Sequence, residues 1–164
     1  MKPFINLNHL ENGQSSSQGI YGETYFVVSE LIGAKRLGYS VSVVPPGKRV
    51  CPFHNHRVNE EMFLVLDGTG TLRFGEQSYP IGPMDIIACP PGGPEVAHQI
   101  INSGSTELRY LCLSTVDPVE VCEQPDSDKL LVFTGPQEAR TLRHVGRKQD
   151  AVDYWEGELG SDEP

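Results

Sequence analysis

The chain has 164 residues, a formal net charge of −9 and a hydrophobic fraction of 38%, which predicts a single soluble domain with one buried core. An acidic chain lacks the basic face that binding to phosphates requires, so the charge argues against nucleic acid and against anionic membrane surfaces as partners. The sequence contains no run of about 18 apolar residues, so we expect no transmembrane helix. Residues 1–13 contain no uninterrupted apolar run, so we expect no secretory signal and a cytoplasmic location.

Short apolar runs between turn residues dominate the chain before residue 136, and no helical periodicity lasts more than two turns there. In one run Tyr39, Val41 and Val43 alternate with serines, which is typical of a half-buried strand. We expect strands within the runs 24–31, 38–47, 61–68, 70–75, 85–93, 97–102, 107–115 and 130–135. Short strands at this spacing predict a β-sandwich or a β-barrel.

The two ends of the chain give weaker patterns. Residues 8–20 are polar and predict a mobile arm, and residues 116–128 predict a loop. Residues 136–149 fit either a short helix or an extended arm, and the pattern does not decide between them. Acidic residues near the C-terminus predict a solvated tail that includes Glu156, Glu158, Asp162 and Glu163.

The four cysteines form no CxxC pair and are expected to be reduced thiols. Cys112 lies within an apolar run, which predicts a small core residue. Cys51 precedes His54 by three residues, so thiolate ligation of a metal is an alternative, although histidine and carboxylate groups already supply enough ligands.

The stretch HNHRVNEE, residues 54–61, contains two histidines one residue apart and two adjacent glutamates. In a strand, residues i and i+2 face the same side, so His54 and His56 point together as two ligands of one metal ion would. The segment RVN must form a turn because the next run is again strand-like. Glu61 opens that next strand and can supply a third ligand, whereas Glu60 would point the other way.

His98 is the best candidate for a fourth ligand, because it follows a Pro-Gly break and opens a strand. Histidine and carboxylate donors suit Fe(II), Mn(II), Ni(II), Zn(II) or Cu(II). Each ligating imidazole should donate its other ring N–H to a further acceptor, which the sequence does not identify. Against this, two histidines at this spacing also occur by chance on exposed surfaces. The predicted metal ligands are His54, His56, Glu61 and His98.

The spacing of this stretch resembles the first motif of the cupin superfamily. That motif is a glycine, a short gap, HxH, three or four residues, a glutamate, six residues and a glycine. Here Gly47 leads into the histidines, four residues separate His56 from Glu61, and six more precede Gly68. This spacing favours Glu61 over Glu60 as the ligand. The gap after Gly47 is one residue longer than the usual pattern.

The second motif of the family is Gly-Asp, a strand, PxG, a short gap, a histidine, three residues and an asparagine. The matching positions are Asp85, the PxG at 90–92, His98 and Asn102. Met84 stands where glycine is usual, and the gap before His98 is longer. Neither departure removes a ligand, but the longer loop predicts a different shape for the mouth of the pocket.

The resemblance covers residues 38–115 and implies an all-β double-stranded β-helix, a jelly-roll barrel with the metal inside. Under this interpretation residues 1–164 form one domain, in which 1–37 are an N-terminal arm and strand. Residues 38–115 are then the barrel core and 116–164 a C-terminal extension. Cupins of this size are commonly dimers, so the resemblance also implies a homodimer.

The sequences PDSDK (125–129) and DYWEGE (153–158) resemble a bacterial group of small single-domain cupins, some of which are labelled sugar-phosphate isomerases. Tyr154 and Trp155 fit a dimer contact, since aromatic residues are enriched at interfaces. They fit equally well a role in covering the open end of their own barrel.

Three functions remain as alternatives. In the first, a divalent metal (Zn, Mn, Fe or Ni) polarises a sugar phosphate for isomerisation or epimerisation while a base moves a proton. Glu60 and Glu95 are candidate bases by position only, so no catalytic residue is assigned. Cations for a phosphate are available, although alternation predicts that two of them, Arg73 and Arg109, face water; the full set is Lys48, Arg49, Arg57, Arg73 and Arg109.

The second alternative is an Fe(II)-dependent dioxygenase, in which the metal carries out the chemistry on a chelating substrate. The third is a non-catalytic module that binds a metal or a small ligand. The metal ligands are the same in all three alternatives, so the sequence does not choose between them.

Overall fold

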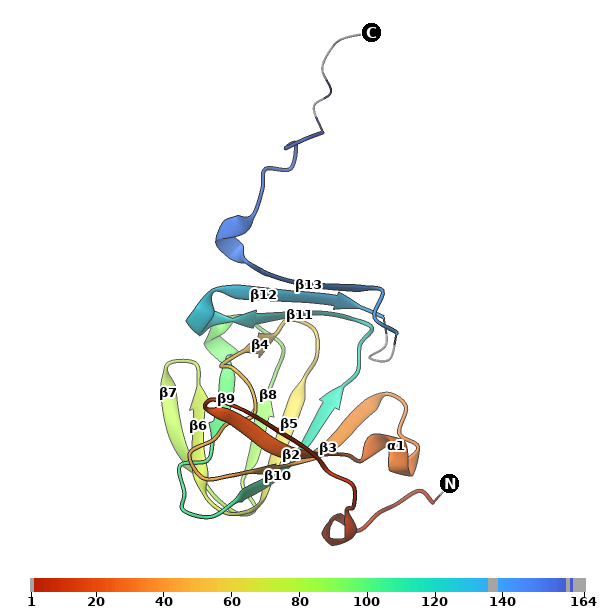
Figure 1. The fold of residues 1–164 in the computed structure, drawn as a ribbon, viewed down its shortest axis with the longest axis vertical. Helices are drawn as coiled ribbons and strands as arrows, with labels where there is room; N and C mark the ends of the chain where they lie inside the picture. The colour runs from red at the N-terminus through yellow and green to blue at the C-terminus, as the bar shows by residue number, and fades with distance from the viewer. Residues whose placement is uncertain (1, 136–138, 159, 161–164) are drawn as a thin grey trace.

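The computed structural model describes residues 2–135, 139–158 and 160, and most of the described chain is β-strand (Figure 1). The largest sheet has six antiparallel strands, in the order β1 (Gln14–Gln18), β2 (Tyr21–Val27), β3 (Leu37–Val44), β10 (Leu108–Thr115), β5 (Glu61–Asp67) and β8 (Ile86–Cys89). Because β10 lies between β3 and β5, strands far apart in the sequence are neighbours in space.

Two smaller antiparallel sheets complete an all-β double-stranded β-helix. One contains β13 (Leu142–Arg147), β12 (Lys129–Thr134), β11 (Val119–Gln124) and β4 (Asn55–His56), and is called the C-terminal sheet below. The other contains β7 (Gln77–Ile81), β6 (Gly70–Phe74) and β9 (His98–Ile101). The remaining elements are one helical turn, α1 (Ser29–Ile32), and 3-10 turns at Leu7–His9, Pro94–Val96, Pro125–Ser127 and Lys148–Asp150.

The apolar core lies on the inner face of the six-stranded sheet, where alternate residues of each strand point inward. Phe63 on β5 pairs with Ile87 on β8, and both are buried. The rings of Phe63 and Tyr110 meet edge to face with their centroids 5.7 Å apart. Val44 and Leu108, which pair across β3 and β10, are completely buried. The strand predicted within residues 38–47 is therefore present, but the predicted alternation is wrong: Ser40 and Ser42 are buried, whereas Tyr39 and Val43 are only partly buried. Ser42 pairs with the core residue Tyr110 and so shares the inner face with it.

Each of the eight predicted runs contains a strand, although the run 24–31 ends in α1. The prediction of an arm at residues 8–20 is wrong for its second half, which forms β1. All five residues of β1 are exposed, so the edge strand carries no apolar pattern by which the sequence could reveal it. Strand β7 was also not predicted.

The loop predicted at residues 116–128 is instead β11 followed by a 3-10 turn. Buried glutamates take the place of apolar residues on this strand, which hides the usual alternation. For residues 136–149 the extended alternative holds where the chain is described, because residues 142–147 form β13; residues 136–138 lie outside the described part.

Met84 adopts a backbone φ of 72°, the left-handed region that glycine enters most easily. Its N–H donates to the carbonyl of Val65 at 2.8 Å, and its side chain is exposed. Met84 thus forms the turn at the position where the family motif has glycine. Its backbone hydrogen bond holds this turn, while its side chain points to solvent.

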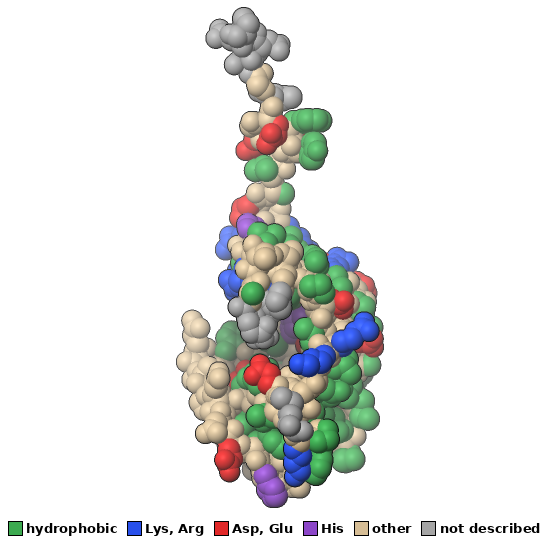
Figure 2. Space-filling view, turned by 90° about the vertical axis from the view of Figure 1, so that its right-hand side faces the viewer, with side chains coloured by type: hydrophobic (Ala, Val, Ile, Leu, Met, Phe, Trp, Pro, Cys, Tyr) green, Lys and Arg blue, Asp and Glu red, His purple; other side chains and the backbone are tan. Residues whose placement is uncertain are grey.

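After β13 the chain leads away from the barrel in both views of the molecule (Figures 1 and 2). Tyr154 and Trp155 are 81% and 57% exposed, with their rings in edge-to-face contact. They do not cover the open end of their own barrel, so that alternative is wrong. Glu156 and Glu158 are exposed as expected, while Asp162 and Glu163 lie outside the described residues.

No helix within the described residues is long and apolar enough to cross a membrane.

Candidate metal centre

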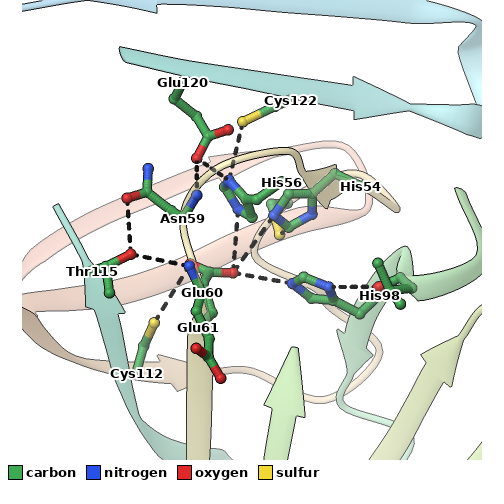
Figure 3. A network of polar contacts seen from close by, with 12 residues as sticks. His54, His56, Asn59, Glu60, Glu61, His98, Cys112, Thr115, Glu120 and Cys122 are labelled. Carbon is green, nitrogen blue, oxygen red and sulfur yellow. Dashed lines mark hydrogen bonds and ion pairs between the residues drawn. The ribbon is translucent and has the colours of Figure 1, made fainter. Parts of the chain in front are cut away.

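The four predicted ligands come together inside the barrel, although they belong to different elements (Figure 3). One ligand atom from each of the four side chains lies within 4.8 Å of the others. Oε2 of Glu61 is 3.0 Å from Nε2 of His98, 3.3 Å from that of His56 and 3.9 Å from that of His54. Three imidazoles and one carboxylate therefore face a common point.

Backbone pairing explains why residues 44 positions apart meet. His54 and His98 form an isolated antiparallel bridge, in which each N–H donates to the other's carbonyl, at 3.1 and 2.7 Å. Glu61 is the first residue of β5, as the alternation predicted, and its side chain points inward. Glu60 lies outside the strand and is exposed, and its N–H donates to Oγ1 of Thr115. The fold therefore places Glu61, and not Glu60, beside the histidines.

His54 and His98 are oriented by backbone carbonyls of nearby residues. Nδ1 of His54 is 2.9 Å from the oxygen of Pro52, and Nδ1 of His98 is 3.3 Å from the oxygen of Val96. A carbonyl oxygen can only accept, so each Nδ1 carries the proton. Each Nε2 is then left with a lone pair directed at the common point, as a metal ligand requires.

His56 is held differently, by side chains of the C-terminal sheet. Its Nδ1 lies 3.2 Å from Sγ of Cys122 and 3.4 Å from Oε2 of Glu120, both on β11 (Figure 3). The pairing of His56 with Cys122 in the ladder between β4 and β11 brings them together. The sequence did not reveal these two residues, because buried acidic residues made β11 resemble a loop.

Glu120 is completely buried, and its carboxylate accepts several backbone N–H groups. Oε1 accepts from Arg57 and Val58 at 3.1 Å each and from Val121 at 2.7 Å, and Oε2 accepts from Asn59 at 2.7 Å. Burial by itself would raise the pKa of Glu120, but His56 and these N–H groups lower it to about 2. Glu120 is therefore a carboxylate that fixes the turn between two of the predicted ligands.

The charges around the common point favour a bound cation. Burial, followed by the neighbouring histidines, lowers the pKa of His54 to about 4, which keeps this imidazole neutral. Burial opposes ionisation of Glu61, but contacts with the imidazoles of His56 and His98 hold its pKa well below the usual range. His56 is also desolvated, yet Cys122, Glu120 and Glu61 raise its pKa. The site thus combines ionised carboxylates with imidazoles around one point.

A divalent metal would fit these residues. Nε2 of His56 is buried and has no hydrogen-bond partner among the described residues, which costs free energy unless a ligand satisfies it. The donors are three imidazoles and a carboxylate, a set that suits divalent transition metals. His56, Glu120 and Cys122 also lie close enough to hold a cation, but the oxygens of Glu120 already accept four N–H groups.

Cys51 is not part of the group of four side chains. Its Sγ lies 3.6 Å from Nδ1 of His54, the nitrogen that faces away from the common point. Burial, with a smaller contribution from Glu61, raises the pKa of the Cys51 thiol to about 12. A neutral thiol in this place does not support thiolate ligation. Cys112, which was predicted to be a core residue, packs against the apolar core. Its Sγ also lies 3.9 Å from Oε1 of Glu61.

Most of the predicted cations have partners away from this point. Arg73 forms a two-pronged ion pair with Asp126, and Arg109 donates to Leu7 and Asn8. Arg57 pairs with Glu123 and Lys48 donates to the carbonyl of Gly19, whereas Nε of Arg49 is buried without a hydrogen-bond partner among the described residues. Four of the five cations are therefore engaged elsewhere.

The inner face of the large sheet contributes further polar groups. Ser42 donates to Oε2 of Glu23 at 2.6 Å, and Ser42 pairs with both Tyr25 and Tyr110 across the neighbouring strands. Burial raises the pKa of Glu23, partly offset by the hydrogen bond from Ser42. The predicted bases Glu60 and Glu95 are both exposed instead. Figure 2 shows a hollow beside the C-terminal sheet in which a histidine side chain is visible.

The fold and the site define a class of protein. Residues 40–114 match the family model for the cupin domain. Residues 40–114 are therefore similar to a cupin domain.

Comparison with solved structures extends this likeness over nearly the whole chain. A protein of Acidithiobacillus ferrooxidans, provisionally described as a sugar phosphate isomerase, superposes with a TM-score of 0.80 at 22% identity, over 93% of this chain and 96% of that one. A cupin of Silicibacter pomeroyi, described as a sugar phosphate isomerase, superposes with a TM-score of 0.76 at 21% identity, over 91% of this chain and 95% of that one. At these identities the likeness establishes the fold alone.

Among curated sequences, auxin-binding protein 4 of Zea mays is 31% identical over 120 residues, which is 66% of this chain and 56% of the maize protein. The chain spans about half the length of the curated relatives it matches.

Proposed function

We propose that the chain binds one divalent transition metal through His54, His56, Glu61 and His98 and uses it to isomerise or epimerise a small sugar-like molecule. The observation that carries the metal site is the convergence of four donor atoms within 4.8 Å, with one buried imidazole nitrogen left without a hydrogen bond. The structural likeness to two proteins described as sugar phosphate isomerases supports the direction of the chemistry.

A metal bound there would act as a Lewis acid on a carbonyl or hydroxyl oxygen of the substrate. The chain must then supply a group that moves a proton between adjacent carbons. We propose Glu23 for this role, because it is the carboxyl on the inner face whose pKa burial raises, and Ser42 holds its Oε2. The exposed positions of Glu60 and Glu95 argue against either as the base.

The substrate is better described as a hydroxy-carbonyl compound than as a phosphate ester. Four of the five predicted cations already bind acidic side chains or backbone oxygens. Hydroxyl groups of Ser42, Tyr25 and Tyr110 instead offer hydrogen bonds of the kind that sugar hydroxyls use. Arg49 is the remaining cation if a phosphate is present.

Solvent exchange tests this function directly. An isomerase that moves a proton next to a carbonyl should incorporate deuterium from D₂O into a sugar or sugar phosphate, which NMR detects before any product accumulates. We expect exchange with Zn(II) or Mn(II) present, its loss in Glu23→Gln with metal content kept, and no change in Glu60→Gln. If no sugar in such a panel exchanges with any of the four metals, the isomerase proposal fails.

A dioxygenase is the second candidate, since three histidines and one glutamate also suit Fe(II). Oxygen uptake by the Fe(II)-loaded protein with catechols, thiols or β-diketones would support it. A non-catalytic module is the third, and the name of the maize relative favours it. Calorimetric binding of a small carboxylate without turnover would be its positive result.

We also propose a homodimer that forms through the C-terminal segment, and a cytoplasmic location, which the four unbridged cysteines support. Exposed Tyr154 and Trp155 follow β13, whose Arg143 and Arg147 could meet the acidic residues of a second copy's segment. Light scattering should give twice the chain mass, and the double substitution of Tyr154 and Trp155 by serine should give the single mass. A monomeric wild-type chain would contradict the dimer.

A further inference from the structure

Glu120 connects a predicted ligand to the part of the chain beyond the cupin match, and unlike Cys122 it also binds the turn that follows this ligand. It lies outside the matched residues 40–114, on a strand of the C-terminal sheet. Its side chain is 0% exposed, yet it carries a charge and lies 3.4 Å from Nδ1 of His56. Burying a carboxylate costs desolvation free energy unless hydrogen bonds and opposite charges offset it. The partners of Glu120 therefore indicate what the residue does.

The contact with His56 sets which nitrogen of the ring is free. A carboxylate can only accept, so the contact of Oε2 of Glu120 with Nδ1 of His56 at 3.4 Å favours a proton on that nitrogen, which also lies 3.2 Å from Sγ of Cys122. The lone pair is then on Nε2, the buried nitrogen that faces Glu61 and has no hydrogen-bond partner within the described chain. A carboxylate in this position also makes the imidazole a stronger donor to a metal.

The backbone contacts set the distance between two ligands. Residues 57–59 connect His56 to the segment that begins at Glu61, and all three of their N–H groups donate to Glu120. Asn59 then ties the turn to the end of β10, because its Oδ1 accepts from Thr115 and Asp117 at 3.0 and 2.9 Å. The same carboxylate therefore orients one ligand and fixes the turn that places the other.

We infer that Glu120 is a positioning residue that sets the affinity of the site for its metal, by orienting His56 and fixing the turn before Glu61. This rests on the proposed metal site and makes the C-terminal sheet a part of it. By linkage, a metal held at His56 favours the state in which β11 is docked on β4, and a docked β11 favours the bound metal.

Cobalt provides the measurement, because Co(II) absorption reports both occupancy and coordination geometry. Titration in competition with a chelator should show that Glu120→Gln binds Co(II) about 10–100-fold more weakly than the wild type, the usual cost of losing an outer-sphere acceptor. Glu120→Asp keeps the charge with a shorter reach and should fall between the two. Glu123→Gln is the matched control: it is a second buried carboxylate of β11, but its side chain pairs with Arg57 and Lys148 and not with His56, so affinity should stay within about threefold.

Two readouts separate positioning from simple loss of structure. In ¹⁵N spectra of the metal-free protein, Glu120→Gln should shift the signals of the His56 ring and of the amides of residues 57–59 while leaving the rings of His54 and His98 unchanged. In the wild-type chain itself, Co(II) should slow hydrogen exchange at the N–H groups of residues 57–59 and 121, a test that needs no variant to fold.

Equal Co(II) affinity and unchanged signals of the His56 ring in Glu120→Gln would overturn the role of Glu120 while leaving the metal site in place. Unchanged hydrogen exchange at residues 57–59 on Co(II) binding would do the same. A wild-type chain that binds no Co(II) at all would overturn the metal site and this inference together.

Discussion

Two regions of the barrel orient the predicted ligands in different ways. His54 and His98 rest on backbone carbonyls two residues before each of them, those of Pro52 and Val96. His56 rests on side chains of the C-terminal sheet, more than 60 residues away in sequence. A backbone carbonyl is kept by almost any sequence, whereas a side chain can be lost by one substitution. The His56 side of the site is therefore the one that mutation can adjust without removing a ligand.

The largest effect is expected where a ligand itself is removed. His98→Ala deletes the most buried of the three histidines, so metal affinity should fall by more than the ~100-fold expected for an outer-sphere partner. Elemental analysis of protein purified in the presence of zinc measures the loss. If His98→Ala keeps a full complement of metal, then the two regions do not form one site.

Glu60→Ala is the control for that experiment, since it changes the carboxylate adjacent to the predicted ligand Glu61. Glu60 is exposed and only its backbone is engaged: its N–H donates to Oγ1 of Thr115 and its carbonyl accepts from the N–H of Thr115. Metal content should match the wild type. If Glu61→Ala keeps its metal and Glu60→Ala loses it, the strand register is shifted by one residue.

A smaller effect is expected when a buried polar residue of the barrel region is replaced. It should change the free energy of unfolding and not the metal affinity. Asn102 is completely buried, and its Nδ2 donates to the carbonyls of Val44 and Thr106 while Oδ1 accepts from Gly104. Asn102→Ala leaves these backbone groups unpaired, which should lower the free energy of unfolding by about 3 kcal/mol. Urea denaturation measures this change.

The folded fraction of Asn102→Ala should bind metal as the wild type does, because Asn102 bonds only to backbone groups of its own turn and of β3. A large loss of metal affinity in this variant would remove the distinction between residues that maintain the barrel and residues that orient the site.

The smallest effect is expected at the exposed link between the two regions. Arg73 on β6 forms a two-pronged pair with Asp126, which follows β11, and its guanidinium stacks 3.7 Å from the Phe53 ring centroid. Exposed ion pairs contribute little, so Arg73→Ala should cost at most about 1 kcal/mol of stability, and the cost should decrease with salt. Thermal melts at two salt concentrations test this. A loss of several kcal/mol would show that surface contacts, and not Glu120, dock the C-terminal sheet.

The sequence alone was enough to predict most strands of the barrel, although not β7, and the four side chains that converge. Alternation placed Phe63 and Val65 on the inner face, and the same alternation selected Glu61 over Glu60. His98 could be named because a Pro-Gly break marks the start of its strand. These patterns depend on local spacing, and local spacing survives folding unchanged.

The supports of His56 could not be predicted, because they depend on pairing between distant strands. Glu120 and Cys122 lie on a strand whose buried positions are acidic or small, and hydropathy treats such a segment as a loop. Glu23 escaped notice for a related reason, since a glutamate in a strand is normally taken as solvent-facing. The signal that could have revealed both is a carboxylate in phase with buried positions of a strand.

The docking of β11 on β4 also has a consequence for the order of events during synthesis. His54, His56 and Glu61 leave the ribosome well before Glu120, which follows Glu61 by 59 positions, so at about 5–20 residues per second several seconds pass before the last support exists. Pairings between such distant segments also form slowly. The newborn chain would thus hold its ion loosely at first and retain it firmly only once the final sheet has closed.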